Sequence, residues 1–298
     1  MKTATLQHRK EKKLLISIFL NISITLAQVI GGVLSGSLAL LSDALHNFSD
    51  VISLVISFAA KKLGKKKASP SKTFGFKRAE ILAAFINAAT LLVVAVLLII
   101  EAIHRFQDQQ PIDSFLVILL ASIAILANGL SVLLIKDNIH NDLNMKSAYL
   151  HLFSDMLASV AVLVGGILMH VYALYWIDSL LTFAIACYLI YVSFDLLKES
   201  SMMLMLFTPK HLSIKEITAQ ILLNKEVNNI HHIHLWQLNE NEIHLEAHID
   251  MNNNVKISDF QEIRMRLEEQ LTEKFSINHI TIQPEFGLEG DKDLIIQD

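Results

Sequence analysis

Six long apolar stretches occupy the first two thirds of the 298-residue chain. Each is about 20 residues long or more, the length of helix that crosses the ~30 Å hydrocarbon core of a bilayer. The first stretch is too long for a signal-peptide core and no small-residue cleavage site follows it, so we expect a retained helix. The pattern predicts six transmembrane helices, over Leu14–Leu34, Leu38–Ala60, Ala79–Ile103, Phe115–Ile135, Ala148–Val171 and Tyr175–Leu197.

The pattern changes after about Leu206, where polar and charged residues return. Ser213–Leu223 and Asp259–Phe275 have the periodicity of amphipathic helices, and Ser258 is a suitable N-cap for the second. Alternating apolar residues predict three strands, over Asn229–Leu238, Ile243–Met251 and Ile277–Pro284. The order α-β-β-α-β predicts a small α+β domain with a helical layer on one face of its sheet.

Composition and charge indicate a membrane protein with a defined orientation. Hydrophobic residues make up 53% of the chain and charged residues 18%, against about 25% charged in an average soluble domain. Lysine and arginine gather in residues 1–13 and in the loop between the second and third stretches, whereas the opposite loops carry few. Both termini are therefore predicted to be cytoplasmic, in a multi-pass protein of the cell (inner) membrane. The predicted domains are a cytoplasmic segment 1–13, a transmembrane domain 14–206 and a cytoplasmic domain 207–298.

The lysine runs have an ordinary interpretation. They serve as topology signals and contact lipid headgroups of the bilayer, and we predict no nucleic-acid partner. The one cysteine, Cys187, lies in an apolar stretch and is interpreted as a small packing residue.

The pattern His-x-x-x-Asp occurs twice inside the apolar stretches, as His46/Asp50 and as His151/Asp155. A four-residue step brings both side chains of a pair onto one helix face. Ionisable side chains inside a membrane are costly, so they usually face a partner or a water-filled cavity. A purely structural polar cluster is the alternative, but the repeated spacing and order favour a tetrahedral site of two His and two Asp for a divalent metal ion.

This ligand set suits zinc that must be released again. Thiolates would hold zinc too tightly for a carrier, and a site of carboxylates alone would favour manganese or magnesium. Cadmium and cobalt fit the same ligands. Because metal needs neutral His and ionised Asp, binding competes with protonation, and we predict protons as the counter-ion.

Other polar residues in the stretches are open to two interpretations. Asp43 shares the face of His46 and Asp50, either as a carboxylate on the metal pathway or, the interpretation we favour, as a residue at the outer interface. Asn21, Asn87 and Asn128 line the pathway or form interhelical hydrogen bonds.

Several segments together resemble the cation diffusion facilitator family, and within it the bacterial zinc, cobalt and cadmium efflux branch. The matching segments are Ser37–Asp50 (SLALLSDALHNFSD), Thr73–Ala84 (TFGFKRAEILAA), Asn144–Asp155 (NMKSAYLHLFSD), His231–Leu238 (HHIHLWQL) and Asn278–Glu285 (NHITIQPE). The resemblance implies a homodimer that exports metal by proton antiport with alternating access. It also implies that His46, Asp50, His151 and Asp155 form the transport site and that the cytoplasmic domain is metallochaperone-like.

The resemblance further implies a second metal site in the cytoplasmic domain. The matching positions are His231, His248 and Glu285, with His279 as another candidate. Gln283 departs from the pattern, because some relatives place a metal-binding histidine there.

Two other functions are weighed against the exporter. An intramembrane metallohydrolase would use the same ligand types, but the sequence holds neither H-E-x-x-H nor G-x-S-x-G, and four protein ligands would close the metal shell. We therefore expect no enzyme. A membrane-bound metal sensor or scaffold would bind metal without flux.

Overall fold

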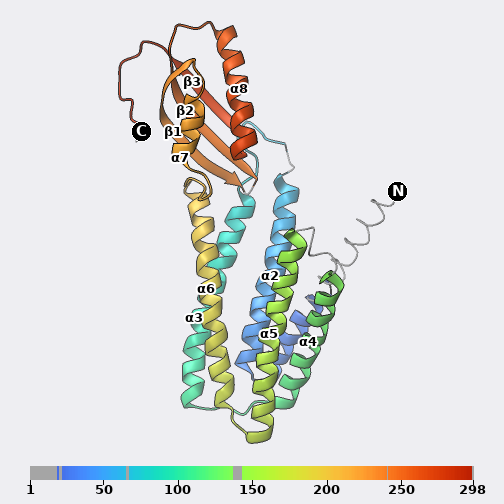
Figure 1. Ribbon diagram of the computed structural model, residues 1–298. Coiled ribbons are helices and arrows are strands. Elements are labelled where there is room, and N and C mark those ends of the chain that lie inside the picture. The colour runs from blue at the N-terminus through green and yellow to red at the C-terminus, as the bar shows by residue number, and fades with distance from the viewer. Residues whose placement is uncertain (1–18, 20–21, 65–66, 137–142, 240, 297–298) are drawn as a thin grey trace, which may run out of the picture. The chain divides into compact units, whose positions relative to one another are not determined.

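The computed structural model describes residues 19, 22–64, 67–136, 143–239 and 241–296 (Figure 1). The predicted N-terminal segment 1–13 and the start of the first predicted span lie outside these residues. The chain divides into two compact units. We call Met1–Ser57 with Ile86–Leu197 the helical unit, and Phe58–Phe85 with Lys198–Asp298 the sheet unit.

Long helices occupy the predicted apolar stretches. They are the helix Ile22–Ser35, α2 (Leu38–Gly64), α3 (Ala79–Gln107), α4 (Ser114–Lys136), α5 (Leu143–Tyr172) and α6 (Trp176–Leu204). Among the described residues, four segments are long and apolar enough to cross a membrane, namely Ala79–Gln107, Ser114–Leu133, Leu152–Tyr172 and Trp176–Leu204. The last four predicted spans are thus confirmed as membrane-spanning candidates, and the first two stay predictions.

The helical unit buries small and polar side chains and exposes large apolar ones. Residues such as Ala39, Ala44, Ala95, Ala121, Ala186, Ser42, Asn128, Ser159 and Thr182 are buried. Large side chains, including Ile86, Val93, Leu97 and Ile100 of α3, are exposed. This distribution is the one expected in lipid, where small residues let helices approach closely and polar groups seek partners inside the bundle.

Two glycines have structural roles in the helical unit, one at a close helix contact and one at a turn. A Cβ atom at Gly166 of α5 would lie 3.1–3.2 Å from Ile118 and Val117 side-chain atoms of α4, and Figure 1 shows these two helices side by side. Gly36, with φ +74°, turns the chain between the helix Ile22–Ser35 and α2, in a conformation that few other residues adopt.

A buried carboxylate fastens the start of α2 to the start of α6. Asp178 accepts hydrogen bonds from Ser37 Oγ at 2.5 Å and from the Leu38 amide at 2.8 Å. The first amides of a helix have no partner within the helix and carry its positive dipole end, so an anion there is stabilising. Asp178 therefore caps the start of α2.

The sheet unit contains α7 (Ile214–Leu222), β1 (Val227–Asn239), β2 (Glu242–Met251), α8 (Ile257–Phe275) and β3 (His279–Glu285). The strand order is β1-β2-β3, with β1 antiparallel and β3 parallel to β2. This order of elements confirms the predicted α+β fold, with each element within a few residues of its predicted bounds.

Apolar residues of the helices and of one sheet face form the core of the sheet unit. Residues of α8 at helical spacing, Phe260, Ile263, Leu267 and Leu271, pack in one cluster with Leu245 and Ile249 of β2. The predicted N-cap is wrong: α8 begins at Ile257 after Lys256, and Ser258 lies inside its first turn, where its hydroxyl bonds the Asp259 carboxylate. Apolar packing of Phe260 and Ile263 fixes this helix without a side-chain cap.

Residues 286–296, which we call the return segment, come back to β1 after β3. Gly287, with φ +67°, lies at the start of this segment. The ladder between β1 and β2 is irregular between His231 and His234, and His232 has φ +50°. There the His232 and Ile233 amides donate to the carbonyls of Asp293 and Leu294, at 3.2 and 2.9 Å. The return segment thus satisfies the backbone donors that the bulge frees.

Candidate metal sites

The structure brings together residues from the two His-x-x-x-Asp motifs. His46 Nε2 of α2 lies 3.8 Å from Asp155 Oδ1 of α5. Asp155 is buried and His46 is mostly buried. An imidazole and a carboxylate at this separation, contributed by two helices, are placed to share one metal ion or one proton.

These two side chains border a cavity of about 250 Å³. Its wall is otherwise mainly apolar, from Ala158, Ala161, Leu181, Ala184 and Ile185, with Asp43, Ser154 and Tyr188 as further polar members. The Tyr188 ring meets the His46 imidazole edge to face, with centroids 6.0 Å apart. The volume is enough for a metal ion with several water molecules.

Asp43 faces the same cavity, which corrects the interpretation that it lies at the outer interface. It is 1% exposed and accepts hydrogen bonds from Gln28 Nε2 at 2.8 Å and from Ser159 Oγ at 3.3 Å. Asn47 Nδ2 donates in turn to Gln28 Oε1 at 3.3 Å. Asp43 is close in sequence to the Ser35–Ser37 loop, a place where interfacial residues are common. Helix packing nevertheless turns its side chain inward.

The other predicted polar residues have mixed outcomes. The side chains of Asp50 and His151 lie outside the described part of the structure, as does Asn21. Asn87 Nδ2 donates to Ser49 Oγ at 2.9 Å, which supports its interpretation as an interhelical hydrogen-bonding residue. Asn128 is buried in α4.

A second group of ligands lies on the sheet unit. His231 and His248 are directly opposite each other on β1 and β2, and Asp250 and Glu285 are opposite each other on β2 and β3. Because side chains alternate along a strand, these residues lie on the sheet face opposite the core pair Ile230–Ile249. Candidate ligand atoms of His231, His248 and Glu285 lie within 4.8 Å of one another.

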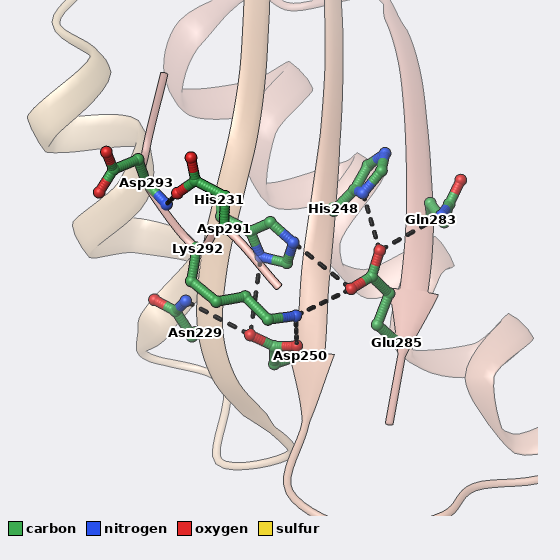
Figure 2. Close-up of polar contacts among 9 residues, drawn as sticks. All are labelled: Asn229, His231, His248, Asp250, Gln283, Glu285, Asp291, Lys292 and Asp293. Carbon is green, nitrogen blue, oxygen red and sulfur yellow. Dashed lines mark hydrogen bonds and ion pairs between the residues drawn. The ribbon is translucent and has the colours of Figure 1, made fainter. Parts of the chain in front are cut away.

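The contacts within this group are close (Figure 2). His248 Nδ1 is 2.8 Å from Glu285 Oε1, and His231 Nε2 is 3.4 Å from Glu285 Oε2. His231 Nδ1 is 3.6 Å from Asp250 Oδ2, beyond hydrogen-bond range, and has no hydrogen-bond partner among the described residues. Two imidazoles and one carboxylate are a donor set that fits zinc, with a position left for another ligand.

Sequence reasoning missed a lysine in this group. Lys292 of the return segment places its ammonium 2.8 Å from Asp250 Oδ1 and 2.9 Å from Glu285 Oε2. Hydrogen bonds to the two carboxylates raise the pKa of Lys292. Burial alone would raise the pKa of Asp250 and of Glu285, but the hydrogen bonds and charge of Lys292 lower both.

His279 and Gln283 occupy different places on β3. His279 lies opposite His244, and their rings are 4.3 Å apart, so His279 is not part of the group around Glu285. Gln283 lies opposite His248 and donates to Glu285 Oε1 at 3.3 Å. The position that departs from the family pattern therefore supports the carboxylate through a hydrogen bond.

Comparison with known families covers nearly the whole chain. The model of the cation efflux transmembrane domain matches residues 14–205. The model of the cation efflux protein cytoplasmic domain matches residues 209–286.

Curated relatives are similar over most of their length. The chain is 35% identical to the "Cadmium, cobalt and zinc/H(+)-K(+) antiporter" of Bacillus subtilis, over 92% of this chain and 89% of that protein. It is 34% identical to the "Metal cation efflux system protein CzcD" of Cupriavidus metallidurans, over 93% and 87%. It is 30% identical to the "Zinc transporter ZitB" of Escherichia coli, over 92% and 87%.

Proposed function

The chain belongs to the cation efflux family, and we propose that it exports a divalent metal ion, zinc foremost, from the cytoplasm in exchange for protons. The family makes it a multi-pass membrane transporter rather than an enzyme. The observation that carries the proposal is the approach of His46 and Asp155, one from each copy of the motif, at the edge of a cavity of about 250 Å³.

The transport site consists of His46, Asp50, His151 and Asp155. Asp50 follows His46 by four residues on α2, and His151 precedes Asp155 by four residues on α5. The helical repeat gives each pair one face. Since His46 and Asp155 already meet, the other two residues of the pattern complete a shell of two nitrogen and two oxygen ligands, which suits zinc.

Relatives named for zinc, cadmium and cobalt support this choice of ions. The same His and Asp ligands accept cadmium and cobalt, so both are secondary substrates.

Proton coupling follows from competition at the same atoms. A metal ion needs a neutral imidazole and an ionised carboxylate, so protons and metal exclude each other. Alternating exposure of the cavity to the two sides then exchanges one for the other. The antiporter name of the Bacillus subtilis relative supports this coupling.

We assign the orientation and assembly from sequence and family. Residues 1–13 and 207–298, which precede and follow the transmembrane domain 14–206, both lie in the cytoplasm. Positive charge gathers in residues 1–13 and in the loop between the second and third stretches, and six spans return the chain to the same side. The protein works as a homodimer in the inner cell membrane, in contact with the lipid bilayer.

A second role, metal sensing, is supported by the group on the sheet unit. His231, His248 and Glu285 form a site for a resident zinc ion, because candidate ligand atoms of all three lie within 4.8 Å of one another. This site would supply binding in the cytoplasm and no transport.

Zinc uptake into inverted membrane vesicles tests the transport proposal. Uptake should require an acidic lumen and should stop when a protonophore collapses the gradient. His46→Ala together with His151→Ala should abolish it, because two of four ligands are lost. Uptake by that variant at the wild-type rate and proton ratio would contradict the assignment.

His248→Gln separates the two roles. It removes a ligand of the cytoplasmic site and should leave zinc uptake within about threefold of wild type, since ligand losses at separate sites act independently. Metal binding without flux in the wild type would favour a sensor, and metal-dependent hydrolysis of a substrate would favour a metallohydrolase.

A further inference from the structure

Lys292 occupies the carboxylates that a metal ion at the cytoplasmic site would use. Its ammonium lies between Asp250 and Glu285, within hydrogen-bond distance of both (Figure 2). Lys292 comes from the return segment and not from the strands that carry His231, His248 and Glu285. The site thus holds a cation belonging to the protein itself.

The lysine and a metal ion cannot use Glu285 together. One oxygen of Glu285 contacts His248 and the other contacts both Lys292 and His231. Zinc binds nitrogen and oxygen at about 2.0–2.2 Å, so these ligand atoms must turn toward a common centre. An ammonium still bound to Glu285 would then lie within about 5 Å of a dication, where like charges repel strongly.

Lys292 is also one of the ties that hold the return segment. Further ties are the hydrogen bonds from the His232 and Ile233 amides to the Asp293 and Leu294 carbonyls, and the packing of the Leu294 side chain against the core. Loss of the ammonium contacts therefore weakens the attachment of this short segment.

We propose that the return segment is a metal-responsive strap: Lys292 holds it closed over the cytoplasmic site, and a divalent metal ion displaces Lys292 and releases it. The strap reports cytoplasmic metal by exposing the bulge of β1, whose amides at His232 and Ile233 lose their acceptors. This inference rests on the proposed cytoplasmic site and not on the transport site.

Hydrogen exchange of the full-length protein in detergent tests the release. Zinc should speed exchange of the His232 and Ile233 amides by about tenfold or more, since local opening frees them. Lys292→Met should show fast exchange at these amides without zinc. It should also bind zinc at the cytoplasmic site about tenfold more tightly, because the metal no longer displaces an ammonium.

Three variants make the outcome decisive. Lys292→Arg keeps the positive charge and should retain slow exchange. Lys215→Met removes an exposed lysine of α7 and should match wild type in exchange and affinity. The share of zinc binding lost in His248→Gln measures occupancy of the cytoplasmic site.

Two results overturn the strap. In the first, zinc binds in a way that depends on His248, but exchange at His232 and Ile233 is unchanged and Lys292→Met binds zinc as wild type does. The metal ion and Lys292 then share the site, and no strap is released. If His248→Gln loses no zinc binding, the cytoplasmic site and the strap both fail, whereas gradient-driven uptake into vesicles still decides the transport proposal.

Discussion

The two units bury opposite kinds of side chain. In the helical unit, Asp43, Asn128, Asp155 and Asp178 are buried while large apolar residues face outward. In the sheet unit, the buried residues are mainly large and apolar, with α8 covering one sheet face. The hydrophobic effect drives packing in water but not between helices in lipid, so the helical unit depends on close contacts and polar partners.

The group of His and carboxylate side chains in the helical unit also differs from the one in the sheet unit. His46 and Asp155 border a cavity with room for an ion and water, whereas His231, His248 and Glu285 are packed around a lysine. An ion that must pass needs a site that is easily emptied, and an ion that is sensed needs a site whose filling changes the structure. The comparison predicts that carboxylates of the helical unit govern flux and that those of the sheet unit do not.

Asp155→Asn should have the largest effect on flux. It removes a charged ligand while keeping the side-chain shape. Mutation of residues that only orient metal ligands already lowers metal affinity or activity roughly 10–100-fold, so zinc uptake should fall by about 100-fold or more. Zinc uptake into inverted vesicles with an acidic lumen measures this.

The matched control is Asp195→Asn, an exposed carboxylate of α6. Its uptake should stay within about twofold of wild type, as for most surface substitutions. Equal losses in both variants would mean that any lost carboxylate disables the bundle, and the contact between His46 and Asp155 would lose its special role.

Asp178→Asn should have the largest effect on the stability of the helical unit. The carboxylate accepts hydrogen bonds from Ser37 and Leu38 while buried, and hydrogen bonds to charged groups are worth about 1.5–3 kcal/mol. The variant should unfold at a temperature several degrees lower in detergent. Asp113, which caps α4 through the Leu116 amide while exposed, provides the comparison.

Asp113→Asn should cost less, within about 0.5 kcal/mol, because asparagine and aspartate cap helices about equally well. A loss as large as that of Asp178→Asn would show that burial adds nothing to this cap.

The sequence predicted the elements better than it predicted the surroundings of single carboxylates. Helix length, strand alternation and the four-residue spacing of His and Asp are local properties, and they gave the elements and the pair His46/Asp155. Asp43 was misplaced because it lies close to a predicted loop, and its burial depends on which helices pack together.

Lys292 was missed for a similar reason. It is one lysine in a polar C-terminal stretch, and its contact with Asp250 depends on the chain reversal after β3 and on the bulge of β1. Charge and spacing in the sequence contain no information about either. His279 was included by the family pattern, but its register on β3 pairs it with His244.

Asp43→Asn should have a smaller effect on flux than Asp155→Asn. Asparagine can still accept the hydrogen bonds from Gln28 and Ser159 but lacks the negative charge that attracts a cation into the cavity. The KM for zinc should rise about fivefold, the equivalent of roughly 1 kcal/mol of attraction, while the maximal rate changes little.

Ser42→Ala, at the neighbouring buried position, should leave the KM unchanged. An unchanged KM in Asp43→Asn together with lower thermal stability would return Asp43 to a structural role.

The smallest effect concerns the pH dependence of the sheet unit. Burial lowers the pKa of His244 below its usual 6.5, and the charge of His279 lowers it further, while Glu242 acts in the opposite direction. The folded state therefore binds fewer protons than the unfolded state. The contribution of neutral His244 is complete above about pH 6.5 and is lost as the pH falls through the lower folded-state pKa.

Urea unfolding of the full-length protein in detergent measures this between pH 5 and 7.5. Trp236 stacks on His244, with ring centroids 5.2 Å apart, so its fluorescence in a Trp176→Phe background reports the region directly. Glu242 does not contribute to the pH dependence in this range. Lys77 lowers the pKa of Glu242 from 4.5 against the effect of burial, so the stability contributed by ionised Glu242 is lost only below the measured range.

His244→Gln should flatten the pH dependence, by less than the stability change expected for Asp178→Asn. His211→Gln, at an exposed position, should keep the wild-type slope. If His244→Gln also kept that slope, protonation of other histidines would account for the acid sensitivity. The histidines around Glu285 would then set both metal binding and acid sensitivity in the sheet unit. The positions of His244 and His231 on the sheet indicate instead that the two properties depend on different histidines.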